Sequence, residues 1–327
     1  MYEAFYGLRE RPFDLVPNPR FLFLAGRQRE ALSNLRYGLT TARGLTLLLG
    51  EAGTGKTTML ETVVGELTAE GIRFVRLSNP TLTRPEFYEF LARTFGLPDE
   101  AVDSKTRFLF SLRRELQERH AAGVLSALII DEAQSVPYEL LEEIRLLSNI
   151  ETTTTKLLNV VLAGQPELAD RLNEASLRQL KQRISLRCEL RPMDMSETAS
   201  YIAGRLRIAG GRPEQIFTRE AVGAVFEASQ GIPRTVNVVA DNALIGGFAA
   251  QVRPISVAFI EEVRRDFDLK PVEPVRPETE SQEPPAAPTA AVAQFPSPGT
   301  TEQGRGDEVA EAPMFGTVRR KRRFSFF

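Results

Sequence analysis

Cysteine, histidine and tryptophan are nearly absent: the 327 residues include one cysteine, one histidine and no tryptophan. Cys188 has no partner for an internal disulfide, and its strand-like surroundings predict a small core residue. His120 follows a charged helical segment, which favours a solvated side chain at a helix end. Because the sequence holds no cysteine–histidine cluster, a zinc site is not expected.

Long apolar runs and an excess of one charge are also missing. No run reaches about 18 residues, the length that a membrane-spanning helix needs. The N-terminus, Met1–Gly7, lacks the cationic region and apolar core of a secretory signal. We therefore expect a soluble, cytoplasmic protein. The formal net charge of −2 argues against a general polycation, and 42% hydrophobic residues suffice for packed cores in about two domains.

The most informative feature present is a glycine-rich loop. Residues 50–57 read GEAGTGKT, which matches G-x-x-x-x-G-K-[ST] throughout. The loop joins a predicted strand, Leu45–Leu49, to a predicted helix, and a helix N-terminus in this position binds anions. Gly53 and Gly55 permit backbone angles that turn successive N–H groups toward phosphate oxygens. The sequence therefore predicts a site for a nucleoside triphosphate.

Two side chains of the loop have distinct expected roles. Lys56 supplies a cation for the β- and γ-phosphates, and the Thr57 hydroxyl is placed to bind Mg²⁺. The residues expected to hold the nucleotide are Gly50, Glu51, Ala52, Gly53, Thr54, Gly55, Lys56, Thr57 and Thr58.

A second motif places two adjacent carboxylates after an apolar strand, in the segment Leu128–Glu132. We expect this strand to lie beside the strand that enters the loop. Asp131 would then reach the metal, directly or through water. Glu132 would face the γ-phosphate, where a carboxylate orients and polarises the attacking water.

Strands and helices alternate between about residue 44 and Arg191. The apolar strands lack polar alternation, which is typical of strands covered by helices on both faces, so we expect a three-layer α/β domain. The expected strands are Leu45–Leu49, Arg73–Leu77, Ala127–Ile130, Leu157–Ala163 and Ile184–Leu190. The expected helices between them are Thr57–Ala69, Pro85–Phe95, Lys105–Ala121 and Tyr138–Ser148.

Beyond Arg191 the strand signals stop, and a small all-helical domain is expected with Ser196 and Thr218 as N-caps. From about Pro271 the composition predicts a disordered, proline-rich tail. We expect an N-terminal segment over 1–43 packed on the nucleotide-binding core. The nucleotide-binding domain would span 44–191, the helical lid 192–268 and the tail 269–327. The expected lid helices are Ser196–Ala209, Thr218–Ser229, Thr235–Ala249 and Val257–Asp266.

Taken together, these motifs resemble AAA+ ATPases and, within that class, the general secretion pathway protein A family. The resemblance covers roughly residues 1–266. Besides the loop, it rests on IDEAQ at 130–134, which contains the carboxylate pair, on YEAFYGL at 2–8 followed by Pro12-Phe13, on GQPEL at 164–168 and on LKQRI at 180–184. It implies a parallel sheet with a P-loop, followed by a helical lid.

The resemblance also assigns further roles. Gln165 matches sensor 1, between the attacking water and the γ-phosphate, whereas Asn159 on the same strand is read more simply as a polar strand residue. Arg234 matches sensor 2, whose guanidinium would reach the γ-phosphate and couple the lid to the nucleotide. Arg183 matches the arginine finger that completes a neighbour's site, with Arg178 as the alternative.

ATP rather than GTP follows from the resemblance, because no guanine-reading Asn-Lys-x-Asp stretch is present. Asn79 either holds Glu132 away from water until a partner binds or is a turn residue before Pro80. An arginine supplied in trans implies slow hydrolysis by isolated subunits, and therefore a homo-oligomeric ring or filament that binds ATP and Mg²⁺ at subunit boundaries.

Three functions remain open from the sequence. The first is an ATPase that assembles or positions a secretion or envelope-polymer export machine. The second is a DNA-binding regulator of the transposition target-selection type, against which the net charge of −2 argues mildly. The third is a scaffold that binds ATP but barely hydrolyses it, and the presence of Glu132 argues against it.

The C-terminal segment Arg319–Phe327 joins five basic residues to three phenylalanines. It could be a solubilising tail, a peripheral contact with the inner membrane, a peptide docked in a partner's groove or a nucleic-acid contact. Larger members of the family resemble this ATPase with a membrane span and a peptidoglycan-binding region added. Neither is seen here, so peptidoglycan contact is not expected.

Overall fold

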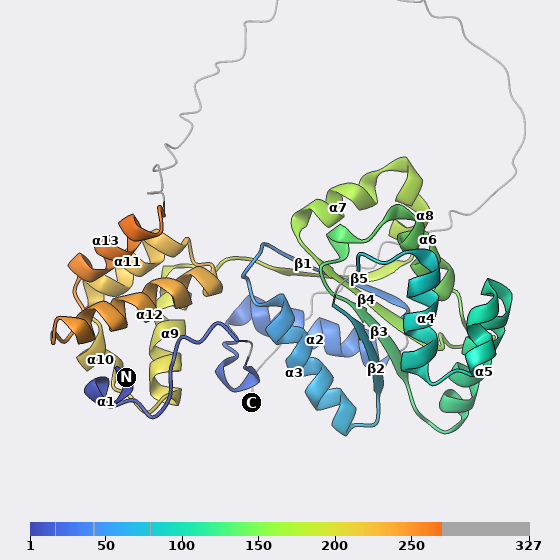
Figure 1. The fold of residues 1–327 in the computed structure, drawn as a ribbon, viewed down its shortest axis with the longest axis horizontal. Coiled ribbons are helices and arrows are strands. Elements are labelled where there is room, and N and C mark those ends of the chain that lie inside the picture. Colours follow the sequence, from blue (N-terminus) through green and yellow to red (C-terminus); the bar gives the residue numbers. More distant parts are fainter. Residues whose placement is uncertain (17, 42, 79, 270–327) are drawn as a thin grey trace, which may run out of the picture. The chain divides into compact units, whose positions relative to one another are not determined.

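The centre of the protein is a parallel β-sheet. The computed structural model describes residues 1–16, 18–41, 43–78 and 80–269, and within them five strands are ordered β2-β3-β4-β1-β5, all parallel (Figure 1). The strands are β1 (Leu45–Gly50), β2 (Arg73–Leu77), β3 (Ser126–Ile130), β4 (Leu158–Gly164) and β5 (Ile184–Leu190). The five predicted strands are thus confirmed, with ends shifted by at most one residue.

Burial explains which strands lie inside the sheet. Every residue of β1, β3 and β4 is buried, whereas β2 and β5 carry exposed positions and lie at the edges. The expectation that β3 lies beside β1 is wrong, because β4 pairs with both of them. Chain order does not fix strand order, and β4, whose residues are all buried, buries more surface in the middle of the sheet than at an edge.

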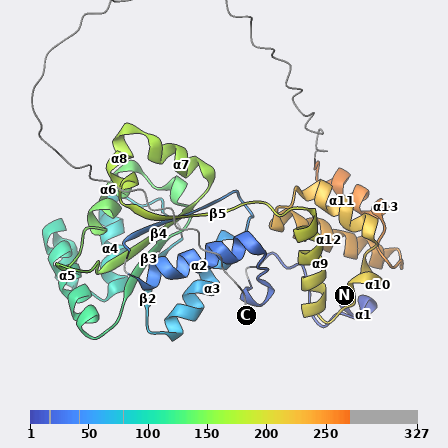
Figure 2. The same ribbon diagram turned by 180° about the vertical axis from the view of Figure 1, so that it is seen from behind.

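Helices cover both faces of the sheet, which confirms the three-layer α/β prediction (Figure 1 and Figure 2). One face packs on α2 and α3, and the other packs on α4 to α8. Successive strand residues alternate between the faces: Leu47 and Leu49 join one apolar cluster, and Leu48 joins the other. The helices are α2 (Gly26–Thr40), α3 (Lys56–Ala69), α4 (Arg84–Phe95), α5 (Lys105–Ala121), α6 (Tyr138–Leu147), α7 (Pro166–Asn173) and α8 (Arg178–Lys181), with short 3-10 turns at η2 (Asp99–Asp103), η3 (Ala133–Ser135) and η4 (Ala175–Leu177).

The region after β5 is helical, as predicted. Thr218 caps its helix as expected, because its side chain accepts a hydrogen bond from the backbone N–H of Ala221 at 3.1 Å. Ser196 does not cap α9, and that expectation is wrong. Asp194 and Glu197 form a capping box two residues earlier, and this box satisfies two backbone donors at once. The helices are α9 (Met195–Ile208), α10 (Pro213–Ile216), α11 (Arg219–Ser229), α12 (Pro233–Ala249) and α13 (Val257–Asp266).

The N-terminal segment differs from the expectation that all of 1–43 packs on the nucleotide-binding core. Helix α1 (Glu3–Tyr6) and the residues around it join the apolar cluster of α9 to α13. The hydroxyl of Tyr6 donates to the carbonyl oxygen of Leu244 at 3.1 Å, and the hydroxyl of Tyr2 bonds to Asp241. Only the second part, with η1 (Pro19–Phe21) and α2, packs on the α/β domain. The segment therefore contacts both parts of the protein, because its aromatic residues Tyr2, Tyr6 and Phe13 are buried in the apolar cluster of the lid helices.

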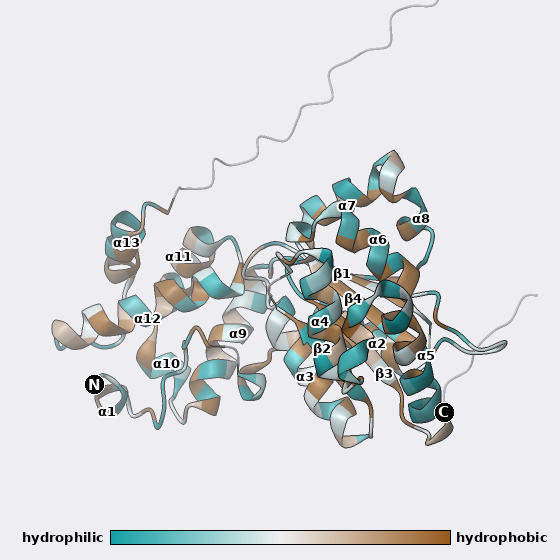
Figure 3. Ribbon diagram, turned by 45° about the vertical axis from the view of Figure 1, so that its right-hand side comes forward, coloured by the Kyte–Doolittle hydropathy of each residue, from teal (hydrophilic) through white to brown (hydrophobic). Residues whose placement is uncertain are grey.

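Apolar residues gather on the strands, and polar residues lie on the outer faces of the helices (Figure 3). Cys188 on β5 is buried, and burial raises the pKa of its thiol to about 11, as suits the predicted core role. None of the helices in the described ranges is long and apolar enough to cross a bilayer. Asn79 and the tail from residue 270, including Arg319–Phe327, lie outside the described residues.

Candidate functional site

The glycine-rich loop runs from the end of β1 to the first residue of α3. Gly53 has φ +83°, and a Cβ built there would lie 2.8 Å from the Cβ of Arg234 on α12. Both the backbone angle and the close approach therefore require glycine. Thr54 stabilises the loop internally, because its hydroxyl donates a hydrogen bond to the carbonyl oxygen of Glu51 at 2.8 Å.

Lys56 points back across the loop. Its ammonium donates to the carbonyl oxygens of Gly50 at 2.7 Å and Glu51 at 3.0 Å. Burial lowers the pKa of Lys56, and the nearby charges of Glu132 and Asp131 oppose that shift. Among the described residues, the hydrogen bonds of this desolvated ammonium go to neutral carbonyl oxygens, so its interaction with an anion placed beside it would be strongly favourable. The loop is therefore suited to phosphate.

The two motifs meet at Asp131. The hydroxyl of Thr57 lies 3.1 Å from Oδ2 of Asp131, although β4 separates their strands. Asp131 is only 4% exposed, and its Oδ1 accepts the backbone N–H of Glu132 at 3.1 Å. A hydroxyl and a carboxylate converging beside the phosphate loop are the hard oxygen ligands that Mg²⁺ takes, so the residues fit this ion.

Arg76 is a member of this cluster that the sequence did not reveal. Its Nη2 lies 3.0 Å from Oδ2 of Asp131, and its Nη1 lies 3.4 Å from Oε1 of Glu61. In the sequence, Arg76 is one polar residue of the edge strand β2. Only the pairing of β2 with β3 brings it to the carboxylate.

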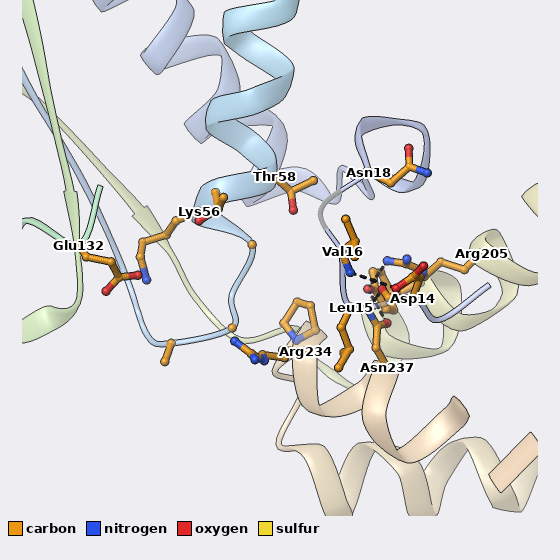
Figure 4. Close-up of a pocket in the computed structure, with 16 residues that line it drawn as sticks. Asp14, Leu15, Val16, Asn18, Lys56, Thr58, Glu132, Arg205, Arg234 and Asn237 are labelled. Carbon is orange, nitrogen blue, oxygen red and sulfur yellow. Dashed lines mark hydrogen bonds between the residues drawn. The ribbon is translucent and has the colours of Figure 1, made fainter. Parts of the chain in front are cut away.

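Glu132 has a left-handed backbone, with φ +52°, which is uncommon for a residue with a side chain. Its exposed carboxylate lies beside the Lys56 side chain in the cleft (Figure 4). The side chain of Gln134 donates from Nε2 to Oε2 of Glu132 at 2.6 Å. The base candidate is therefore held at the cleft by a specific contact.

The loop borders a cleft with a volume of about 310 Å³ (Figure 4). The cleft has room for a ligand in the size range of small-molecule pockets. The sequence did not reveal the contributions of the N-terminal segment or of Asn237, which tertiary packing alone brings here. The cleft is lined by Asp14, Leu15, Val16, Asn18, Ala52, Gly53, Gly55, Lys56, Thr57, Thr58, Glu132, Tyr201, Arg205, Pro233, Arg234 and Asn237.

A second cavity of about 60 Å³ adjoins the loop. Its lining is mainly apolar and combines the N-terminal segment (Phe21, Leu22), the end of β5 (Leu190) and the lid (Met193, Pro233). The cavity shares Gly55 and Thr58 with the larger cleft. A charged, polar cleft thus continues into an apolar recess.

Arg234 lies where the resemblance predicts, in the first turn of α12 and on the cleft lining. Its backbone N–H donates to the carbonyl oxygen of Gly53 at 3.1 Å. The phosphate loop therefore caps the N-terminus of a lid helix, whose first N–H groups have no partner within the helix. This bond links the loop directly to the lid.

The remaining predicted residues lie elsewhere. Gln165 follows the end of β4, and its backbone N–H donates to Oε1 of Gln134 at 3.1 Å. Asn159 is structural, since it donates to the carbonyl oxygen of Leu39 at 2.9 Å and is buried. Arg183 and Arg178 are exposed near the start of β5, away from the cleft lining.

Comparison with known families agrees with this geometry. Residues 39–172 match the model of the AAA domain. The match contains the phosphate loop, the carboxylate pair and β4, and the helical region follows it in the chain. The fold and the site are thus those of an AAA+ domain.

The particular relative it resembles is the general secretion pathway protein A of Aeromonas hydrophila. The two are 42% identical over 250 residues, which cover 76% of this chain and 45% of that protein. This chain therefore spans less than half the length of the relative. The chain belongs to the AAA+ class and is related to that secretion protein.

Solved structures share the fold at low sequence identity. The ORC2 protein of Aeropyrum pernix matches with a TM-score of 0.59 and 18% identity, over 79% of this chain and 71% of that chain. Cdc6p of Pyrobaculum aerophilum matches with a TM-score of 0.60 and 16% identity, over 78% and 70%. These likenesses support the architecture alone.

Proposed function

We propose that this chain binds ATP in the cleft beside residues 50–58 and hydrolyses it to ADP and phosphate. The observation that carries this proposal is the 3.1 Å contact between Thr57 and Asp131, because it joins the phosphate loop to the carboxylate pair. In this arrangement Lys56 holds the β- and γ-phosphates, and Glu132 accepts the proton of the attacking water.

Mg²⁺, held by Thr57 and Asp131, would neutralise charge on the phosphates. Arg234 extends from the lid toward the same cleft, and its guanidinium would meet the γ-phosphate. Gln165 would act as sensor 1 once nucleotide is bound. The apolar recess lined by Leu190, Met193 and Pro233 would take the adenine ring, since an apolar surface suits a purine face.

The active form that we propose is a homo-oligomer, either a ring or a filament. Arg183 precedes β5, whose Ile184 pairs with Leu45 at the far end of β1 from the loop. Six residues of strand correspond to about 20 Å, so Arg183 is too far from its own cleft to touch a γ-phosphate there. No ion pair within the described residues occupies its guanidinium, which supports its use on a neighbour's nucleotide.

The process that we propose is the assembly or positioning of a secretion or envelope-polymer export system. This proposal rests on the relative, whose name is general secretion pathway protein A. We place this action on the cytoplasmic side of the inner membrane, where ATP is available. Peripheral contact through Arg319–Phe327 belongs to the same proposal.

Two variants separate binding from hydrolysis. Glu132→Gln keeps the shape of the side chain and the loop, so it is expected to bind a fluorescent ATP analogue with Mg²⁺ as the wild type does, while releasing no phosphate. Lys56→Ala removes the loop cation and is expected to lose binding. Equal binding by Lys56→Ala and the wild type would contradict the site.

The Glu132→Gln form also serves to identify the partner. It is expected to stay in the ATP-bound, assembled state, so a pull-down from cells with this form should enrich envelope or secretion proteins relative to Lys56→Ala. Enrichment of DNA or a transposase instead would replace the proposed process with target selection.

A further inference from the structure

Gln134 makes two side-chain contacts that join separate parts of the site. Its Nε2 donates to Oε2 of Glu132 at 2.6 Å. Its Oε1 accepts the backbone N–H of Gln165, which follows β4, at 3.1 Å. One amide thus connects the carboxylate after β3 to the residue after β4.

The chemistry of these contacts fixes the orientation of the amide. A backbone N–H can only donate, so it selects the oxygen of Gln134, and the ionised carboxylate can only accept, so it selects the nitrogen. The second oxygen of Glu132 has no partner among the hydrogen bonds described. The contact therefore aligns the carboxylate and leaves one oxygen available to a water molecule.

The loop that carries Gln134 is itself anchored by helix α7. Arg171 donates from Nη2 to the carbonyl oxygen of Val136 at 2.9 Å, and its Nη1 bonds to the carbonyl oxygen of Gln134. Its guanidinium lies 4.6 Å from the centre of the Tyr138 ring. Because α7 begins directly after Gln165, this helix and that residue hold the same loop.

Gly164, the last residue of β4, leaves space for the Gln134 side chain because it has no Cβ. A Cβ on Gly164 would lie 2.9 Å from Oε1 of Gln134, which is closer than such contacts tolerate. The left-handed backbone of Glu132 is strained and persists only where neighbouring residues hold it in place. The contact from Gln134 is one such restraint.

We propose that Gln134 is a positioning residue that orients Glu132 for hydrolysis and transmits the position of Gln165 to it. The inference rests on the proposed function, because it assumes that Glu132 is the base. The γ-phosphate would move the chain at Gln165. Because the backbone N–H of Gln165 holds the Gln134 amide, this movement would turn the amide and, with it, the carboxylate of Glu132.

Gln134→Met tests the proposal, because methionine has a similar length and neither of these hydrogen bonds. Its kcat is expected to fall about 10- to 100-fold, in the range of a misplaced general base. Its KM and its affinity for the fluorescent ATP analogue are expected to stay within about twofold, since Gln134 does not line the cleft. Gln134→Glu keeps the acceptor for Gln165 but sets a carboxylate against Glu132, and it is expected to be at least as slow.

Gln117→Met, on the exposed face of α5, is the matched control and should leave kcat unchanged. A Gln134→Met protein with wild-type kcat, or one in which affinity and kcat fall together with the melting temperature, overturns the positioning role. A wild type that does not hydrolyse ATP overturns the proposed function, and the inference with it. Turnover retained by Gln134→Met overturns the inference alone.

Discussion

At the scale of single residues, the site brings opposite charges together around a buried carboxylate. Asp131 is buried, and one of its oxygens is shared between the hydroxyl of Thr57 and the guanidinium of Arg76. Without a bound cation, Arg76 is the positive charge in direct contact with this carboxylate among the described ion pairs. A buried carboxylate that loses its partner is costly, so Arg76 stabilises the site.

Arg76→Met is therefore expected to lower the free energy of unfolding by about 1–3 kcal/mol, as for a polar group left unpaired in a partly buried site. Urea unfolding without nucleotide measures the change. Arg73→Met, at an exposed position of the same strand, is the control and should stay within about 0.5 kcal/mol of the wild type. Equal stability of both variants would contradict the role given to Arg76.

At the scale of elements, the sequence predicts those features of the helices and strands that depend on residues close together in the chain. The apolar strands, the helices between them and the cap at Thr218 all follow from neighbouring residues. Strand order did not follow, because β4 enters between β1 and β3 through contacts far apart in the chain. The start of α9 differs from the expected one because Asp194, like Ser196, is a residue type that caps helices well, and Glu197 completes a capping box with Asp194.

Helix α9 offers a direct test of that correction. Asp194→Ala removes the side chain that accepts the backbone N–H of Glu197 at 2.8 Å, and it is expected to cost about 1 kcal/mol of stability. Ser196→Ala, inside the first turn, is expected to change stability by less than about 0.5 kcal/mol. Thermal melting of the two variants compares them, and a larger loss for Ser196→Ala would restore Ser196 as the cap.

At the scale of the whole molecule, the cleft is assembled from segments far apart in the sequence. The phosphate loop and the carboxylate pair could be recognised from the sequence because each is a short run with fixed spacing. The lining from Asp14, Tyr201 and Asn237 could not, because it depends on how the N-terminal segment meets the lid. The same holds for Gln134, whose side chain joins two strand ends.

Mixing subunits tests the proposed oligomer. Lys56→Ala subunits lack nucleotide binding but keep Arg183, and Arg183→Ala subunits have the reverse defect, with a loss of about 10³–10⁵ in rate expected. An equal mixture should regain about a quarter of wild-type activity, since half the sites are intact and half of those face an intact finger. No recovery, together with full activity of Arg183→Ala alone, would contradict Arg183 as the finger and direct the same test to Arg178.

The central claim is that the cleft beside Lys56 hydrolyses ATP, and the most direct measurement is phosphate release by the purified wild type with ATP and Mg²⁺. The account predicts steady release that stops when Mg²⁺ is chelated and that is lost in both Lys56→Ala and Glu132→Gln. Release that persists unchanged in Lys56→Ala, or no release by the wild type at any protein concentration, would contradict it.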